Sequence, residues 1–242
     1  MASRIVVELP PGITCEDLIG GGTSGLAALI PGTETVIKFY HGDSDDNERC
    51  KLEAAIYEHL SQSKIERPPS LLTYQGKSKC GKGILLKYAR NNSMRRFLSV
   101  PENSVSHTTI LRWIEQTTLA LCFLHQNHVA HGDVTCDNLF LDEEYNVHLG
   151  DFTSATWPLT DERKTEDMFE LGLAFYEMST GIRLYHGLFL NPDEKMEKIK
   201  HNGLPDLSRI EPKNVADLIA NCLQLHHKDA EEILSSVRHM SP

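Results

Sequence analysis

A glycine-rich segment at residues 19–27 limits the folds open to this chain more than any other part of the sequence. Its letters, Ile-Gly-Gly-Gly-Thr-Ser-Gly-Leu-Ala, contain glycines in the spacing G-x-G-x-x-G. In a dinucleotide-binding fold the last of these glycines opens a helix. Here Pro31 and Gly32 interrupt the chain soon afterwards, and residues 35–39 have the composition of a strand. The segment therefore predicts a strand–loop–strand hairpin.

The strand that follows the hairpin carries a lysine in a position that suits phosphate binding. Glycines allow a backbone to approach phosphate oxygens closely and to aim its N–H groups at them. Lys38 follows two β-branched residues, so its side chain is expected on the face opposite Ile37, within reach of such phosphates. A solvent-facing strand lysine explains this stretch equally well.

A helix predicted at residues 48–62 offers a partner for this lysine. Leu52, Ile56 and Leu60 recur on one face of it, and Glu53 lies at the edge of that apolar stripe. A carboxylate that points inward needs a cation, and Lys38 is the candidate. Taken alone, the position fits an exposed helix glutamate better.

Two polar segments in the second half of the chain carry the groups that phosphoryl transfer requires. The reaction needs a carboxylate that orients the attacking hydroxyl and accepts its proton, and oxygen ligands for Mg²⁺. Asp133 supplies the carboxylate, while Asn138 and Asp151 supply the oxygens. Each of these residues could separately be a turn former or a loop cap. Their order after the glycine segment favours a phosphotransferase.

Composition narrows the class of protein. The 242 residues suit one large domain or two small lobes, and the formal charge of −10 disfavours a nucleic-acid-binding protein. No apolar run is long enough for a membrane span or a signal peptide. We therefore expect an intracellular protein, cytoplasmic or nuclear, without a membrane partner. The six scattered cysteines are expected to be reduced thiols.

Apolar periodicity divides the chain into a strand-rich first third and a helical remainder. The polar residues 91–93 suit the boundary between the two. The acidic stretch at 43–48 is expected to be a solvated loop that leads into the first helix. The predicted strands lie within 5–40, at 84–86, at 138–141 and at 146–149, and the predicted helices lie at 48–62, 107–127, 166–180 and 215–237.

With these motifs the chain resembles the eukaryotic protein kinase superfamily over about residues 13–237. The resemblance implies an α+β, bilobal protein-kinase-like fold in a single domain, 1–242, with a shortened activation segment. Its small β-rich N-lobe would span 13–90 and its mostly helical C-lobe 91–237. The sequence that begins at His131 is also similar to small kinase-like proteins of filamentous fungi.

The resemblance implies ATP and Mg²⁺ as cofactors and assigns a role to each matching residue. Lys38 and Glu53 would clamp the phosphates, Asp133 would be the catalytic base, and Asn138 and Asp151 would hold the metal. Asp167 resembles the aspartate that anchors the backbone of the catalytic loop. The residues implied for ATP binding are Ile19, Gly20, Gly22, Gly25, Ala27, Lys38, Leu86 as gatekeeper, and Lys87 and Ala89 through their backbones.

The chain also departs from the family pattern. Gly132 replaces the arginine before the catalytic aspartate, Thr135 replaces a lysine that helps to hold the γ-phosphate, and Thr153 replaces the glycine of the D-F-G motif. Asp167 follows Asp151 by only 16 positions, and no A-P-E motif is present. Most of the usual peptide-docking platform is therefore expected to be missing.

Three functions remain open on the sequence alone. The first is a protein serine/threonine kinase that acts on an unidentified hydroxyl. The second is a catalytically weak pseudokinase that serves as a nucleotide-binding or scaffolding module, as the short segment, Gly132 and Thr135 suggest. The third is a small-molecule kinase of the aminoglycoside or choline kinase type, which the missing peptide platform would fit.

Overall fold

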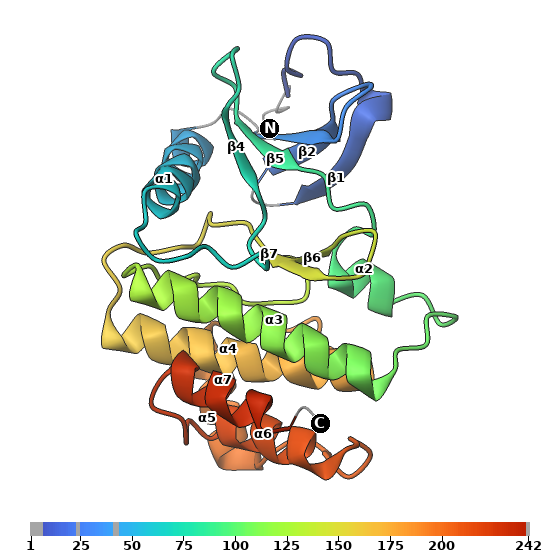
Figure 1. The fold of residues 1–242 in the computed structure, drawn as a ribbon, viewed down its shortest axis with the longest axis vertical. Coiled ribbons are helices and arrows are strands. Elements are labelled where there is room, and N and C mark those ends of the chain that lie inside the picture. Colours follow the sequence, from blue (N-terminus) through green and yellow to red (C-terminus); the bar gives the residue numbers. More distant parts are fainter. Residues whose placement is uncertain (1–6, 23–24, 41–43, 241–242) are drawn as a thin grey trace, which may run out of the picture. The chain divides into compact units, whose positions relative to one another are not determined.

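The computed structural model describes residues 7–22, 25–40 and 44–240, and Figure 1 shows its ribbon. The chain divides into two compact units. The first unit holds the chain up to Lys64, together with Leu72–Tyr88 and Asp151–Ala155. The second unit holds Ile65–Leu71, Ala89–Gly150 and the chain from Thr156 onward. Each unit thus includes a short segment that lies within the other's stretch of sequence.

The first unit contains a five-stranded antiparallel sheet. In spatial order its strands are β1 (Leu18–Gly22), β2 (Gly25–Leu29), β3 (Thr35–Phe39), β5 (Ile84–Lys87) and β4 (Tyr74–Lys77), preceded by a short 3₁₀ helix, η1 (Cys15–Asp17). The predicted glycine hairpin is formed by β1 and β2, and residues 23–24 at its tip lie outside the described residues. A Cβ on Gly25 would lie 2.5 Å from the carbonyl oxygen of Phe39, so this strand contact requires glycine.

Alternation along β3 sends its side chains to two faces of the sheet. Ile37 and Phe39 join Ala28 in an apolar cluster, and Lys38 lies on the opposite face, as predicted. Helix α1 (Ser44–Ser61) packs beside β4 and buries Ile56 and Leu60. The strand alternation and the helical period thus place the apolar residues of this unit as the sequence indicates.

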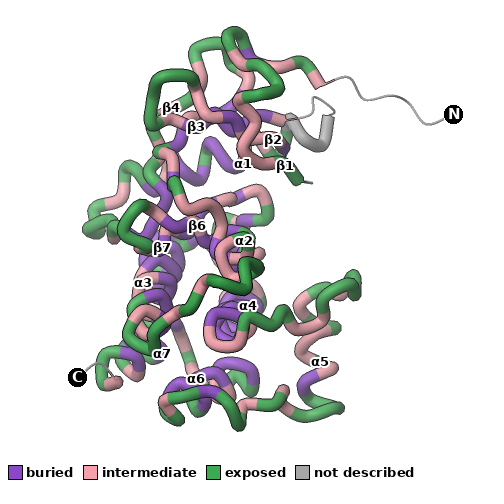
Figure 2. Tube along the Cα trace, turned by 90° about the vertical axis from the view of Figure 1, so that its right-hand side faces the viewer, coloured by how far each residue is buried: buried purple, intermediate pink, exposed green. Residues whose placement is uncertain are grey.

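The second unit is helical apart from the antiparallel hairpin of β6 (Leu139–Leu141) and β7 (Val147–Leu149). Its helices are α2 (Met94–Leu98), α3 (His107–Gln126), α4 (Asp161–Thr180), α5 (Pro192–Asn202), α6 (Lys213–Leu223) and α7 (Ala230–Arg238). Helices α3 and α4 lie side by side; α7 packs on α3 and α6 packs on α4 (Figure 1). Figure 2 shows that the middle of this helical layer is buried.

Side-chain caps fix the ends of the long helices. The Ser106 hydroxyl accepts a hydrogen bond from the Thr109 amide at the start of α3, and the Thr160 hydroxyl does the same for Arg163 at the start of α4. Helix α4 ends at Gly181, whose φ of 69° is left-handed, as the sequence predicts. No helix in the described part of the chain is both long and apolar enough to span a lipid bilayer.

Several predicted element limits are wrong. Helix α4 begins at Asp161 rather than 166, because a capped but polar first turn precedes its apolar stripe. Helix α1 begins at Ser44, so the acidic stretch is largely helical, and Asp43 lies outside the described residues. Residues 7–17 contain no strand, and residues 5 and 6 lie outside the described residues. All six cysteines are unpaired in the structure.

Two helices of the second unit were not predicted. Helix α5 is mostly charged and Ile199 is its one buried residue, so it has no apolar periodicity to find. Helix α2 has five residues, of which only Met94 is buried. Both are recognisable instead by their caps, Asn191 with Glu194 for α5 and Ser93 for α2.

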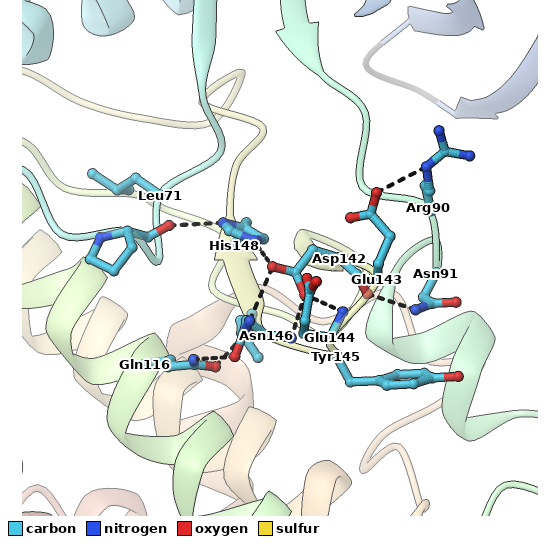
Figure 3. Close-up of polar contacts among 12 residues, drawn as sticks. Leu71, Arg90, Asn91, Gln116, Asp142, Glu143, Glu144, Tyr145, Asn146 and His148 are labelled. Carbon is cyan, nitrogen blue, oxygen red and sulfur yellow. Dashed lines mark hydrogen bonds and ion pairs between the residues drawn. The ribbon is translucent and has the colours of Figure 1, made fainter. Parts of the chain in front are cut away.

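A polar network fastens the β6–β7 hairpin to its surroundings (Figure 3). Asp142 accepts hydrogen bonds from the Asn146 amide at 2.7 Å and from His148 Nε2 at 3.0 Å. The other ring nitrogen of His148, Nδ1, donates to the Pro69 carbonyl oxygen at 2.8 Å. The hairpin thereby holds the segment Ile65–Leu71 in the second unit.

Candidate functional site

The first unit buries an ion pair between Lys38 of β3 and Glu53 of α1. Lys38 Nζ lies 2.9 Å from Glu53 Oε2 and 3.1 Å from Oε1. Glu53 is completely buried and Lys38 is only 8% exposed, so neither residue is the surface group that its own stretch of sequence also allowed. Glu53, at the edge of the apolar stripe of α1, thus faces the sheet.

Asp151 completes the surroundings of the lysine, because residues 151–155 belong to the same unit. Its Oδ1 lies 2.7 Å from Lys38 Nζ. Burial alone would lower the pKa of the Lys38 ammonium, but the charges of Glu53 and Asp151 outweigh burial and raise that pKa. Lys38 therefore remains a cation between two carboxylates.

Tyr40, which the sequence interpretation did not single out, also binds Glu53. Its hydroxyl donates a hydrogen bond to Glu53 Oε2, and the Phe152 amide donates to Oε1 at 3.2 Å. Burial, followed by the charge of Glu53, raises the pKa of Tyr40, which keeps the phenol protonated and a donor. The available signal was its spacing, because two residues after Lys38 the chain returns to the same face.

The Asp151 carboxylate is held by the residue that replaces the D-F-G glycine. Thr153 donates to Asp151 Oδ1 from its hydroxyl at 2.6 Å and from its amide at 3.3 Å. Asp151 has a left-handed φ of 66°. Phe152 is fully buried and meets the ring of Tyr57 edge-on at a centroid distance of 4.7 Å. Thr153 therefore helps to orient the carboxylate that faces Lys38.

The residues predicted to contact a nucleotide, Lys38 of β3 among them, lie on four strands of the first unit, with one exception in the second. Leu86 is buried on β5, and Lys87 next to it has an exposed side chain. The Lys87 amide donates to the Thr73 carbonyl at 2.8 Å, so a bond from its backbone to a base would use the carbonyl. Ala89 is buried in the second unit. The glycine-hairpin residues are Ile19, Gly20 and Gly22 on β1 and Gly25 and Ala27 on β2.

The second unit brings Asp133 and Asn138 together in the loop 131–138. Asn138 Nδ2 donates to Asp133 Oδ2 at 2.7 Å and to the Asp133 carbonyl at 2.9 Å. The Asn138 side-chain oxygen accepts no hydrogen bond from any residue in the described ranges. His131 Nε2 donates to the Gly150 carbonyl at 3.0 Å, which leaves Nδ1 to accept from the Asp133 amide at 3.3 Å.

Asp167 anchors this loop, as the resemblance implies. Its carboxylate accepts hydrogen bonds from the His131 amide at 2.8 Å and from the Gly132 amide at 2.7 Å. His125 Nε2 lies 2.9 Å from the same carboxylate. Gly132 has a φ of 76°, a conformation that glycine adopts without a steric cost. The glycine that replaces the family arginine thus suits the backbone of the loop.

Charged residues that the sequence interpretation did not single out hold the rest of the loop 131–138. The Val134 amide donates to Glu170 Oε2 at 2.9 Å. Arg95 of α2 pairs with Asp137 at 2.8 Å and with Glu177 of α4 at 2.6 Å. The loop is therefore fixed along its whole length to α2 and α4.

The groups in each unit fit the cofactors that the family generally uses, ATP and Mg²⁺. A buried ammonium in the first unit is suited to phosphate oxygens. The expected metal ligands are oxygens, the carboxylate of Asp151 in the first unit and the side-chain amide of Asn138 in the second. Carboxylate and amide oxygens are ligands that Mg²⁺ prefers.

Comparison with known proteins supports the same family. Residues 30–165 match the family model described as protein tyrosine and serine/threonine kinase. The chain belongs to this family. It is 29% identical over 119 residues to serine/threonine-protein kinase Nek3 of Oryza sativa subsp. japonica, which covers 48% of this chain and 20% of that protein. It is 24% identical over 236 residues to serine/threonine-protein kinase pakG of Dictyostelium discoideum, covering 84% of this chain and 20% of that protein.

The chain thus spans about a fifth of the length of these two relatives. Both names describe serine/threonine kinases, and the matches support a protein-kinase-like function. The β-sheet region followed by the helical region agrees with the α+β kinase-like fold that the resemblance implied.

Proposed function

We propose that this chain is an ATP- and Mg²⁺-dependent protein serine/threonine kinase. The observation that carries the proposal is the buried Lys38, whose ammonium lies between Glu53 at 2.9 Å and Asp151 at 2.7 Å. Burying Lys38 and Glu53 is unfavourable unless their charges are paired and used, and the half-buried Asp151 adds a second carboxylate to the lysine. An arrangement of one cation and two carboxylates in the unit that carries the glycine hairpin suits a nucleoside triphosphate with its metal.

The residues of the first unit would bind and orient the nucleotide. Bound ATP with Mg²⁺ supplies the phosphoryl group and the charge neutralisation that the reaction needs. Lys38 would bind phosphate oxygens, with Glu53 fixing the direction of its ammonium. Asp151 would contribute a metal ligand. The backbone of the glycine hairpin would lie over the phosphates, and Leu86 would border the base.

The residues of the second unit would act on the acceptor hydroxyl. Asp133 would orient the hydroxyl and accept its proton at a carboxylate oxygen. The hydrogen bond from Asn138 Nδ2 to Asp133 Oδ2 supports this role, because it fixes the carboxylate and uses the amide nitrogen of Asn138, so that the amide oxygen would serve as the metal ligand. His131 and Asp167 would hold the backbone that leads to the reacting group.

A nucleotide-binding pseudokinase is the second candidate, and the contacts of Asp151 favour it. Its Oδ1 already accepts the Lys38 ammonium, the Thr153 hydroxyl and the Thr153 amide, all of which compete with a metal ion. The connection from Asp151 to α4 is also short, residues 152–160, which leaves little chain to dock a peptide. A small-molecule kinase shares this second feature.

A comparison of phosphoryl transfer by the wild type and by Asp133→Asn tests the proposal. With labelled ATP and a peptide library containing Ser, Thr and Tyr acceptors, we expect the wild type to label Ser or Thr peptides. Asp133→Asn should lose at least about a hundredfold in kcat while ATP still stabilises it in a thermal-shift titration. Asp206→Asn, an exposed carboxylate in a loop before α6, is the matched control and should keep full activity.

The alternatives predict different results in the same assay. Binding of ATP by the wild type without transfer to any peptide, aminoglycoside or choline supports the pseudokinase. Transfer to a small molecule alone supports the third function. Full activity in Asp133→Asn contradicts the assignment of the base.

A further inference from the structure

Helix α4 presents a second carboxylate to the loop 131–138, one turn beyond Asp167. Asp167 accepts the amides of His131 and Gly132 at 2.8 and 2.7 Å, and Glu170 accepts the amide of Val134 at 2.9 Å. Residues three apart on a helix lie on the same face, so the two carboxylates form one surface. The backbone amides on both sides of Asp133 are therefore hydrogen-bonded to carboxylates of α4.

Glu170 is unusual for a residue whose only task would be to hold a loop. It is 3% exposed, and the cation that faces it, Lys195 of α5, lies 3.7 Å from its Oε1. A neutral side chain could accept the Val134 amide without the cost of burying a charge. The use of a carboxylate here indicates that the charge itself matters to the loop.

The carboxyl group can also exchange protons with water. Glu170 lines a cavity of about 430 Å³ together with Thr135, Leu173, Arg183 and Lys195. The charged groups that face it are Asp133 from the loop, Asp167 from its own helix and Lys195 from α5. Its protonation can therefore follow the pH of the solvent without unfolding of the unit.

We propose that Glu170 is a positioning residue, whose carboxylate sets the backbone of the Asp133 loop through the amide of Val134, with Lys195 supporting its charged form. The role of Asp133 as the base rests on the proposed function. The clamp on the loop does not, because it follows from the contacts within the second unit.

The charge of Glu170 determines how strongly it holds Val134. Burial, and next the charge of Asp133, raise the pKa of Glu170 to about 7, while Lys195 and the Val134 amide oppose the shift. Above this pH the carboxylate is ionised and accepts a charge-assisted hydrogen bond, which is stronger than a neutral one. Below this pH the group is neutral, and its hold on the Val134 amide weakens.

The hydrogen exchange of the Val134 amide, followed by NMR between pH 6 and pH 8, tests the inference. After correction for intrinsic exchange, we expect the protection factor of the wild type to rise roughly tenfold across this range. Glu170→Gln keeps the shape and an acceptor but cannot ionise, so its protection should stay at the low-pH level. Glu162→Gln, exposed on the same helix, should behave like the wild type.

A second variant and a kinetic measurement separate positioning from simple support of the fold. Lys195→Met should move the pH at which Val134 protection changes upward, because it removes the cation that favours ionised Glu170. In a kinase assay, Glu170→Gln should lower kcat about tenfold at pH 8 and leave KM for ATP within about twofold of the wild type.

Each outcome decides one claim. Equal and pH-independent Val134 protection in the wild type and Glu170→Gln would overturn the inference, as would unchanged kcat in an active enzyme. A wild type without phosphoryl transfer contradicts the proposed function instead. In that case the exchange of Val134 alone still confirms or rejects the clamp.

Discussion

Among single residues, Glu53 is the one on which the contacts of the first unit converge. Its buried carboxylate accepts Lys38, the hydroxyl of Tyr40 and the amide of Phe152. Three donors satisfy a group that would otherwise be costly to bury. Contacts within the first unit therefore hold the Lys38–Glu53 ion pair together.

Tyr40→Phe should weaken this arrangement. The substitution keeps the ring but removes the donor, so the Glu53 carboxylate loses one hydrogen bond in a buried setting. We expect the free energy of unfolding to fall by about 1–3 kcal/mol, measured by urea denaturation. Tyr145→Phe removes a hydroxyl from an exposed tyrosine and should change stability by less than about 0.5 kcal/mol. Equal effects of the two variants contradict the role of Tyr40.

Glu170 should make stability depend on pH. Its pKa is raised from 4.5 to about 7 in the folded chain, so folding favours the protonated form. Between these values the folded state binds more protons than the unfolded state, and stability falls as pH rises. Relative to Glu170→Gln, the wild type should lose up to about 3 kcal/mol between pH 4.5 and pH 8, measured by urea unfolding at several pH values.

The control and the contradicting outcome for this prediction are simple. Glu162→Gln removes an exposed carboxylate from the same helix, and its difference from the wild type should stay constant with pH. If the difference between the wild type and Glu170→Gln is also constant, burial does not raise the pKa of Glu170. A costly ionisation next to the proposed base is consistent with a group retained for function rather than for stability.

Contacts between residues far apart in sequence mark the limit of prediction at the residue scale. Lys38 and Glu53 could be paired because strand alternation and helical period place both of them. The spacing of Tyr40 placed it on the face of Lys38 but did not give its partner, and Glu170 had no such signal, because these contacts depend on how β3 meets α1 and how α4 meets the loop 131–138. Glu53 is likewise buried, although its position in the helix, taken alone, favours an exposed glutamate.

At the scale of elements, the close packing of α4 on α6 depends on Gly172. A Cβ at this position would lie 2.7 Å from the Cβ of Cys222 and 3.3 Å from two atoms of Leu223. The first distance is shorter than side-chain carbon contacts allow, so the two helices would have to move apart. Gly172, which follows Leu171 in this helix, therefore allows the close approach of α6.

Gly172→Ala should destabilise the protein although alanine favours helix formation. The intrinsic gain is about 1 kcal/mol, and overpacking of a tight contact costs about 1–3 kcal/mol. We expect a net loss of up to about 2 kcal/mol in urea unfolding. Lys164→Ala, in the same helix but outside its buried core, should be nearly neutral. An increase in stability for Gly172→Ala contradicts the close approach of α4 to α6.

Elements with a continuous apolar stripe could be predicted from the sequence, and those without one could not. The first half of helix α3 buries one face at a 3.6-residue period, whereas residues 120–125 of α3 and the apolar part of α4 are buried on nearly all sides. Helix α5 and the first turn of α4 are polar and are held by caps and by contacts with other helices. Their limits depend on tertiary packing, which periodicity does not report.

For the whole molecule, the main finding is that each unit contains a short segment from the part of the sequence that otherwise forms the other unit. Residues 151–155 lie late in the sequence but join the first unit, where Asp151 reaches Lys38. Ile65–Leu71 lies early but joins the second unit, where the Ser70 carbonyl accepts the Leu149 amide at 2.8 Å and Pro69 binds His148. A division of the chain by composition alone cannot show such segments.

Binding of Mg²⁺ and ATP to the wild type and to Lys38→Met, measured by calorimetric titration, tests the central claim most directly. The wild type should bind, and ATP at a hundred times its Kd should stabilise it by about 2.7 kcal/mol. Lys38→Met should lose at least about tenfold in affinity, and Lys38→Arg, which keeps the charge, should lose less. No binding by the wild type, or equal binding by a folded Lys38→Met, would contradict the account.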